Sequence, residues 1–125
     1  LSKGNELYLD GSHNPDAAKN INISLEGLNE KKDLCMIIGM LNTKDPLNYV
    51  REFSNIKLIK TIEIPGEENS LTSKELKDKL LTLHNDTSEE NSIGDAIKSI
   101  ASSEPDARIL ICGSLYLAGQ VLKLN

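Results

Sequence analysis

Aromatic residues are scarce in this chain of 125 residues: they make up 3% of it, and tryptophan is absent. Aliphatic side chains therefore have to build the core. No apolar run approaches the ~20 residues of a membrane span, and no basic stretch followed by an apolar one marks a signal peptide. We therefore predict no membrane partner, and the expected compartment is the cytoplasm.

Basic residues are in the minority, with 14 Lys and Arg against 19 Asp and Glu and a formal net charge of -5. This balance argues against broad electrostatic binding to nucleic acid. Cysteine is rare as well: Cys35 and Cys112 each lie inside an apolar run, where small buried hydrophobes belong. They are too few for a disulfide scaffold or a metal site, which favours a reducing compartment.

Apolar segments alternate with helical patterns along the chain. The patterns predict strands at 7–9, 34–38, 56–64 and 109–112, and helices at 15–28, 46–53, 73–83, 93–101 and 115–124. Asn14, Asp45 and Thr72 precede three of these helices as candidate N-caps. Two strands are continuous apolar runs, which is typical of a parallel sheet covered on both faces. We therefore predict one doubly wound α/β domain over 1–125.

The segment 84–92 is polar and acidic where the alternation requires another strand. A surface loop or a poor edge strand fits it better. Within it, His84 is interpreted as a loop histidine. The acidic pairs at 67–68 and 89–90 are interpreted as solvated loop faces, although the first pair follows a strand and could border a site.

In open α/β sheets, ligands bind beyond the carboxyl ends of the strands, which draws attention to segments 10–15, 39–45 and 113–117. In the first, Asp10 can accept hydrogen bonds from a ribose or orient a nucleophile. His13 can meet developing negative charge or pass a proton near neutral pH. The alternative is a simple capped turn.

The second and third segments each carry one polar candidate. Lys44 is a compact cation suited to a carboxylate or phosphate, or else a solvated surface charge. Ser114 offers a hydroxyl at the start of the last helix, or is an ordinary N-cap. The sequence has neither a P-loop nor Gly-x-Gly-x-x-Gly, so it contains no phosphate cradle sufficient to hold a nucleotide alone. No serine-hydrolase elbow occurs either, which argues against nucleophilic catalysis.

Four motifs occur in an order and spacing that resemble one family. They are Leu-Asp-Gly-Ser-His-Asn-Pro at 9–15, Gly-Met-Leu-Asn-Thr-Lys-Asp at 39–45, Ile-Pro-Gly-Glu-Glu-Asn-Ser-Leu at 64–71 and Gly-Ser-Leu-Tyr-Leu-Ala-Gly at 113–119. Together they resemble the carboxy-terminal domain of folylpolyglutamate synthase/dihydrofolate synthase, in the Mur ligase superfamily. The likeness covers nearly the whole chain.

The resemblance implies a Rossmann-like domain that closes over an ATPase domain on its N-terminal side, which would be this chain's partner. In the family, ATP phosphorylates a carboxylate of dihydropteroate or a folate, and the amine of L-glutamate attacks the acyl phosphate to form an amide. ATP and Mg²⁺ would be held mainly by the ATPase domain. We therefore expect no cofactor on this domain alone, and no activity from it.

The resemblance also implies residue roles. Asp10 and His13 would belong to the catalytic and nucleotide-binding site, with Asp10 touching the ribose and His13 facing the phosphate and glutamate region. Lys44 would pair with a carboxylate of glutamate. Ser114 would hydrogen-bond the same amino acid, with Tyr116 beside it.

The remaining residues of the first motif have smaller implied roles. Asn14 would hold the shape of the nucleotide-binding turn. Ser12 stands where the family most often has Ala, a small-for-small change without steric consequence. The stretch 83–92 is more polar than the usual fourth strand of the family.

Further questions stay open at this stage. Members that make dihydrofolate and members that only add glutamates share these motifs. A freestanding module that binds a nucleotide or an amino acid, and an interaction subunit with vestigial motifs, are the alternative functions. Because the numbering starts at Leu1, immediately before the first strand, we expect the chain to be a piece of a larger protein.

Overall fold

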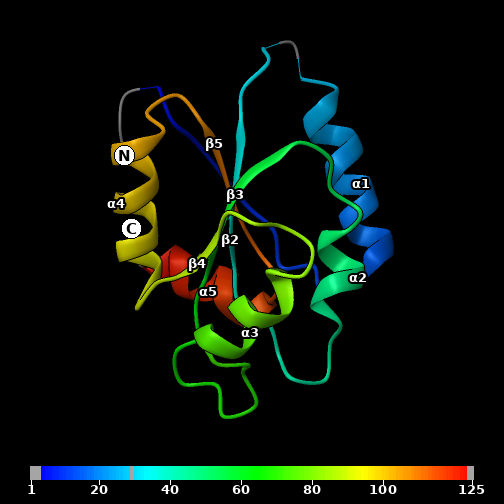
Figure 1. Cartoon of the computed structure of the whole chain (residues 1–125), viewed down its shortest axis with the longest axis vertical. Helices are drawn as coiled ribbons and strands as arrows, with labels where there is room; N and C mark the ends of the chain where they lie inside the picture. The colour runs from blue at the N-terminus through cyan, green and yellow to red at the C-terminus, as the bar shows by residue number, and fades with distance from the viewer. Residues whose placement is uncertain (1–3, 29, 124–125) are drawn as a thin grey trace.

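The computed structural model describes residues 4–28 and 30–123, where five parallel strands form one sheet in the order β1-β5-β2-β3-β4 (Figure 1). The strands are β1 (Glu6–Leu9), β2 (Leu34–Ile38), β3 (Ile56–Thr61), β4 (Thr87–Glu89) and β5 (Arg108–Cys112). The helices are α1 (Pro15–Glu26), α2 (Pro46–Val50), α3 (Ser73–Leu80), α4 (Ile93–Ser103) and α5 (Leu115–Lys123). The predicted α/β class with a parallel sheet is confirmed.

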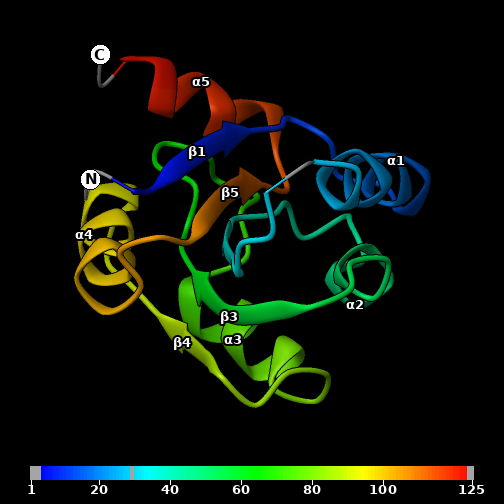
Figure 2. The ribbon, with the colours of Figure 1, turned by 90° about the horizontal axis from the view of Figure 1, so that it is seen from above.

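The two central strands, β2 and β5, are buried along their whole length and face a helical layer on each side (Figure 2). On one face, Met36, Ile38 and Leu110 pack with residues of α1, α2 and α3. On the other, Ile37 and Ile109 pack with residues of α4 and α5. Burial on both faces explains the continuous apolar runs of the sequence.

Both cysteines are buried and free, as predicted. Burial disfavours the thiolate and raises the pKa of Cys35 and of Cys112 to about 12. Both thiols therefore stay protonated at neutral pH and act as small core residues. No helix among the described residues is long and apolar enough to cross a membrane.

Three helices end two or three residues earlier than predicted, because their last turns tighten. Amide N–H groups of Leu28, Phe53 and Leu83 each bond to the carbonyl three residues earlier, at 3.3, 3.0 and 2.9 Å, instead of the one four residues earlier. The predicted end of the last helix at Leu124 lies outside the described residues, as does Leu1. The three expected N-caps, Asn14, Asp45 and Thr72, all accept the predicted backbone hydrogen bonds.

The third strand also ends early, at Thr61 instead of residue 64. Its outer partner, β4, is only three residues long and ends opposite Thr61 at Glu89. β4 confirms the interpretation of 84–92 as a poor edge strand, and His84 lies outside any helix or strand. The solvated face expected at 89–90 is wrong for Glu90, whose side chain is 21% exposed and pairs with Lys60 at 3.3 Å.

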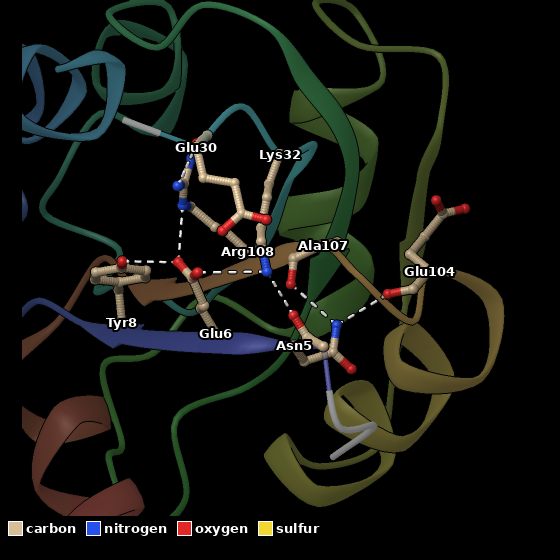
Figure 3. Close-up of polar contacts among 9 residues, drawn as sticks. Asn5, Glu6, Tyr8, Glu30, Lys32, Glu104, Ala107 and Arg108 are labelled. Atoms are coloured by element: carbon tan, nitrogen blue, oxygen red, sulfur yellow. Dashed lines mark hydrogen bonds and ion pairs between the residues drawn. The ribbon is translucent and has the colours of Figure 1, made fainter. Parts of the chain in front are cut away.

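At the amino ends of β1 and β5, a polar cluster ties the edge strand to its neighbour (Figure 3). The Arg108 Nε donates to Glu6 Oε1 at 2.9 Å, Tyr8 Oη donates to the same oxygen at 2.9 Å, and Lys32 Nζ lies 3.3 Å from Glu6 Oε2. Arg108 is 6% exposed and also donates to the carbonyl of Glu30. The Arg108 guanidinium, followed by the Tyr8 hydroxyl, holds the pKa of Glu6 below its usual value.

This lowered pKa makes an acid-stability prediction. The unfolded chain binds a proton at Glu6 more readily than the folded chain does. The stabilisation that ionised Glu6 gives the folded state is therefore complete above the unfolded pKa of about 4.3, and it is lost as pH falls through the lower folded pKa. We expect Glu6→Gln to lose less stability than wild type between about pH 5 and pH 3. Urea unfolding across this range measures it.

The matched control is Glu63→Gln, because Glu63 is exposed and has no ion pair within the described part of the chain. It should follow the acid response of the wild type. An unchanged acid response in Glu6→Gln would contradict a stabilising role for the cluster.

Candidate functional site

The loops after β1, β2 and β5 are neighbours, because these strands are adjacent in the sheet and run in the same direction. Backbone hydrogen bonds join the loops directly. The Gly113 N–H donates to the Ser12 carbonyl at 3.1 Å, and the Gly39 N–H donates to the Cys112 carbonyl at 3.3 Å. The three segments singled out in the sequence therefore lie together at the carboxyl ends of the strands, which we call the carboxyl edge of the sheet.

Two glycines permit this close approach. Gly113 has φ +101°, and a Cβ on it would lie 2.3 Å from the Gly39 carbonyl oxygen. At Gly11, a Cβ would lie 3.2 Å from the Cα of Leu115. No side chain fits at Gly113, because the first neighbour is backbone and cannot rotate away. The glycines thus set the spacing of the loops.

The loops enclose a cavity of about 230 Å³ between the ends of β1, β2 and β5. It is lined by His13, Leu41, Lys44, Gly113, Ser114, Leu115 and Tyr116. Four of the six residues proposed from the sequence therefore line one space: His13 and Lys44 lie on the loops after β1 and β2, Ser114 immediately precedes α5, and Tyr116 lies in its first turn. We call this space the edge cavity.

Three polar groups in the edge cavity can take a ligand. Lys44 is half-buried, and its ammonium has no ion pair among the described residues. The Nδ1 atom of His13 is buried and has no hydrogen-bond partner in the described chain. A buried ring nitrogen without a partner is uncommon, and a ligand hydrogen bond would satisfy it.

Ser114 is 3% exposed and caps α5: its Oγ accepts the Tyr116 N–H at 3.1 Å. The N-cap alternative is therefore correct for the oxygen, but the hydroxyl proton remains available as a donor. The Tyr116 ring is exposed at the mouth of the cavity.

Asp10 and Asn14 do not line the edge cavity. Asp10 instead borders a separate hollow of about 330 Å³ beside α1, while its carboxylate accepts from Ser12 N at 3.0 Å and Ser12 Oγ at 3.1 Å. The Asn14 Oδ1 accepts the Ala17 N–H at 2.9 Å as the cap of α1. The first motif is thus a capped turn that also carries a carboxylate and an imidazole to the edge.

No sequence pattern marks Tyr49, whose hydroxyl lies 3.1 Å from Ser12 Oγ. Nothing in the short α2 pattern separates it from an ordinary core residue, because only the fold brings α2 against the first motif. Ser12 was expected to differ from Ala without steric consequence. The structure adds that its hydroxyl makes two hydrogen bonds.

A larger hollow, of about 760 Å³, lies at the opposite, amino edge of the sheet and is lined by residues 30–33, 55 and 104–107. Ligands of parallel sheets bind at the carboxyl edge, so the smaller edge cavity is the candidate site. Within residues 4–28 and 30–123, no group of three or more His, Cys, Asp or Glu side chains could hold a metal ion.

The fold is a parallel α/β domain, and its candidate site, the edge cavity, takes its polar groups from segments that follow three adjacent strands. The profile of the family described as dihydrofolate synthetase, C-terminal domain, matches residues 2–124. The chain belongs to this family. A search of curated proteins gave no match.

Solved structures with the same fold include folylpolyglutamate synthases. One from Mycobacterium tuberculosis, complexed with ADP and AMPPCP, is 19% identical with a TM-score of 0.83, over 94% of this chain and 29% of that one. One from Thermotoga maritima is 24% identical with a TM-score of 0.80, over 98% and 28%.

A bifunctional folylpolyglutamate synthase/dihydrofolate synthase with Mn, AMPPNP and L-glutamate bound is 20% identical with a TM-score of 0.78, over 99% and 30% of the two chains. The chain thus spans less than a third of the length of these three structures.

The glycine contact between the loops makes a stability prediction. We expect Gly113→Ala to lower the free energy of unfolding by about 3 kcal/mol, because it combines a disfavoured φ with a backbone clash. Gly119→Ala is the control: Gly119 lies inside α5 with no atom within 4 Å of its added Cβ. It should stabilise by about 0.5 to 1 kcal/mol. Equal effects of the two substitutions in urea unfolding would contradict the close approach.

Proposed function

We propose that this chain is the C-terminal domain of an ATP-dependent ligase that adds L-glutamate to dihydropteroate or to folates. The observation that carries the proposal is the convergence of His13, Lys44 and Ser114 on one cavity at the carboxyl edge of the sheet. Membership of the family and the fold shared with the synthases support it. Residues 1–125 would form one domain, with an ATPase domain of the same protein as its partner.

In this proposal the edge cavity holds the incoming glutamate. The Lys44 ammonium pairs with a glutamate carboxylate, and the Ser114 hydroxyl donates to the same amino acid. The His13 ring faces the phosphate and the amine, while Asp10 accepts hydrogen bonds from the ribose of the nucleotide. Asn14 keeps the turn in shape as the cap of α1.

The reaction itself is an acyl transfer. The terminal phosphoryl group of ATP passes to the substrate carboxylate, which leaves ADP and an acyl phosphate. The glutamate nitrogen then attacks the acyl carbon; a C–N bond forms, the C–O bond to phosphate breaks, and the amine loses its proton. ATP and Mg²⁺ would be held mainly by the partner ATPase domain, with Asp10 and His13 completing the nucleotide site from this domain.

Two substitutions in the complete ligase separate the proposed roles. Lys44→Ala should raise the KM for glutamate about tenfold or more with a smaller change in kcat, because it removes a charged hydrogen bond to the substrate. His13→Ala should instead lower kcat about 100-fold, because the ring acts on the reacting groups. Steady-state kinetics with varied glutamate distinguish these effects.

Lys98→Ala is the control for the loss of one positive charge, since Lys98 is exposed on α4. It should behave as the wild type does. Wild-type kinetic constants for both Lys44→Ala and His13→Ala would refute the site assignment.

The isolated 125-residue chain offers a separate check. We expect it to hydrolyse no ATP and to bind ATP or glutamate at most weakly, because each ligand would be shared between two domains. Isothermal titration calorimetry measures the binding. Micromolar ATP affinity would contradict the divided site and favour a freestanding binding module.

A further inference from the structure

A hydrogen-bond chain runs from the protein core to the Asp10 carboxylate. The Tyr49 hydroxyl lies 3.1 Å from Ser12 Oγ, and Ser12 Oγ donates to Asp10 Oδ2 at 3.1 Å. Because a serine hydroxyl has a single proton, and Ser12 gives it to Asp10, Tyr49 is the donor in the first bond. Both hydrogen bonds therefore point the same way: the tyrosine donates to the serine, and the serine donates to the carboxylate.

Tyr49, the first donor in this series of hydrogen bonds, is fixed in place by the core. Tyr49 is 0% exposed, and its ring packs against Phe53 with the ring centroids 5.5 Å apart. Burial raises the pKa of the Tyr49 hydroxyl above its ordinary value, so the group keeps its proton and remains a donor. The ring cannot turn to water without leaving the core.

The backbone of the turn that carries Asp10 is held without these side-chain hydrogen bonds. It is already held by the bond from Asp10 N to the Ile111 carbonyl at 2.9 Å and the bond from Gly113 N to the Ser12 carbonyl at 3.1 Å. The Ser12 N–H also holds Asp10 Oδ1 at 3.0 Å. What the two hydroxyls add is a fixed position for the second carboxylate oxygen, Oδ2.

We propose that Tyr49 and Ser12 are positioning residues that hold Asp10 ready for the vicinal hydroxyls of a nucleotide ribose. This inference rests on the proposed function. An ionised carboxylate has about four acceptor sites, and Ser12 occupies two of them, one on each oxygen. Each oxygen thus keeps a site for one ribose hydroxyl, with its orientation already set, which reduces the ordering that binding requires.

The test compares the affinity of the complete ligase for ADP with that for 2′,3′-dideoxy-ADP by calorimetry. The ratio of the two Kd values reports contact with the ribose hydroxyls and is insensitive to a general loss of folded protein. We expect Asp10→Asn to remove the preference for ADP. Tyr49→Phe and Ser12→Ala should each reduce it about three- to tenfold while dideoxy-ADP binding stays unchanged.

Tyr8→Phe is the control for the loss of one tyrosine hydroxyl, because the Tyr8 hydroxyl donates to Glu6 and takes no part in the hydrogen bonds that reach Asp10. It should keep the full preference. Ser103→Ala, on the exposed end of α4, serves the same purpose for Ser12→Ala.

The outcomes distinguish the positioning role of Tyr49 and Ser12 from the proposed function. Loss of the preference in Asp10→Asn, with the preference intact in both Tyr49→Phe and Ser12→Ala, would overturn the positioning role and leave the proposed function standing. A wild-type ligase that binds the two nucleotides equally would overturn the ribose contact and with it the positioning role. A loss of affinity for both nucleotides in Tyr49→Phe, at a constant ratio, would also overturn the positioning role and leave Tyr49 as a core residue.

Discussion

The contact between Gly113 and Gly39 is the constraint on which the candidate site depends. Two loops that follow adjacent central strands approach until a Cβ on one would lie 2.3 Å from a carbonyl oxygen of the other. That distance brings the start of α5 against the loop after β2, and the Ser12 carbonyl completes the junction by accepting the Gly113 N–H. The three loops can approach closely enough to form the edge cavity because position 113 is a glycine.

The polar groups at the two ends of the strands differ in how fully they are paired. At the amino edge, Lys32 and Arg108 both pair with Glu6, and the Arg108 pair joins β5 to β1. At the carboxyl edge, the Lys44 ammonium has no ion pair and the His13 Nδ1 has no hydrogen-bond partner among the described residues. A buried polar atom without a partner costs folding free energy, and a bound ligand that hydrogen-bonds to it would recover that cost. The proposed ligase role uses this second edge alone.

Much of the fold follows from the sequence, because periodicity and capping are local signals. Continuous apolar runs marked the two central strands, and Asn14, Asp45 and Thr72 marked helix starts that the structure reproduces. Strand and helix ends were harder, since they depend on tertiary pairing, such as the short β4 that limits β3. The contribution of Tyr49 could not be predicted, because its hydroxyl bonds to Ser12, which lies 37 residues away in the sequence. The roles of the site residues stay predictions, although the sequence placed four of them on what proves to be one cavity.

The most direct test of the account is a crystal structure of the complete ligase with AMPPNP, Mn²⁺ and L-glutamate. We predict that the Lys44 Nζ and the Ser114 hydroxyl lie within about 3.2 Å of glutamate oxygens, with the nucleotide ribose beside Asp10. Glutamate bound away from this edge, with Lys44 and Ser114 facing solvent, would contradict it.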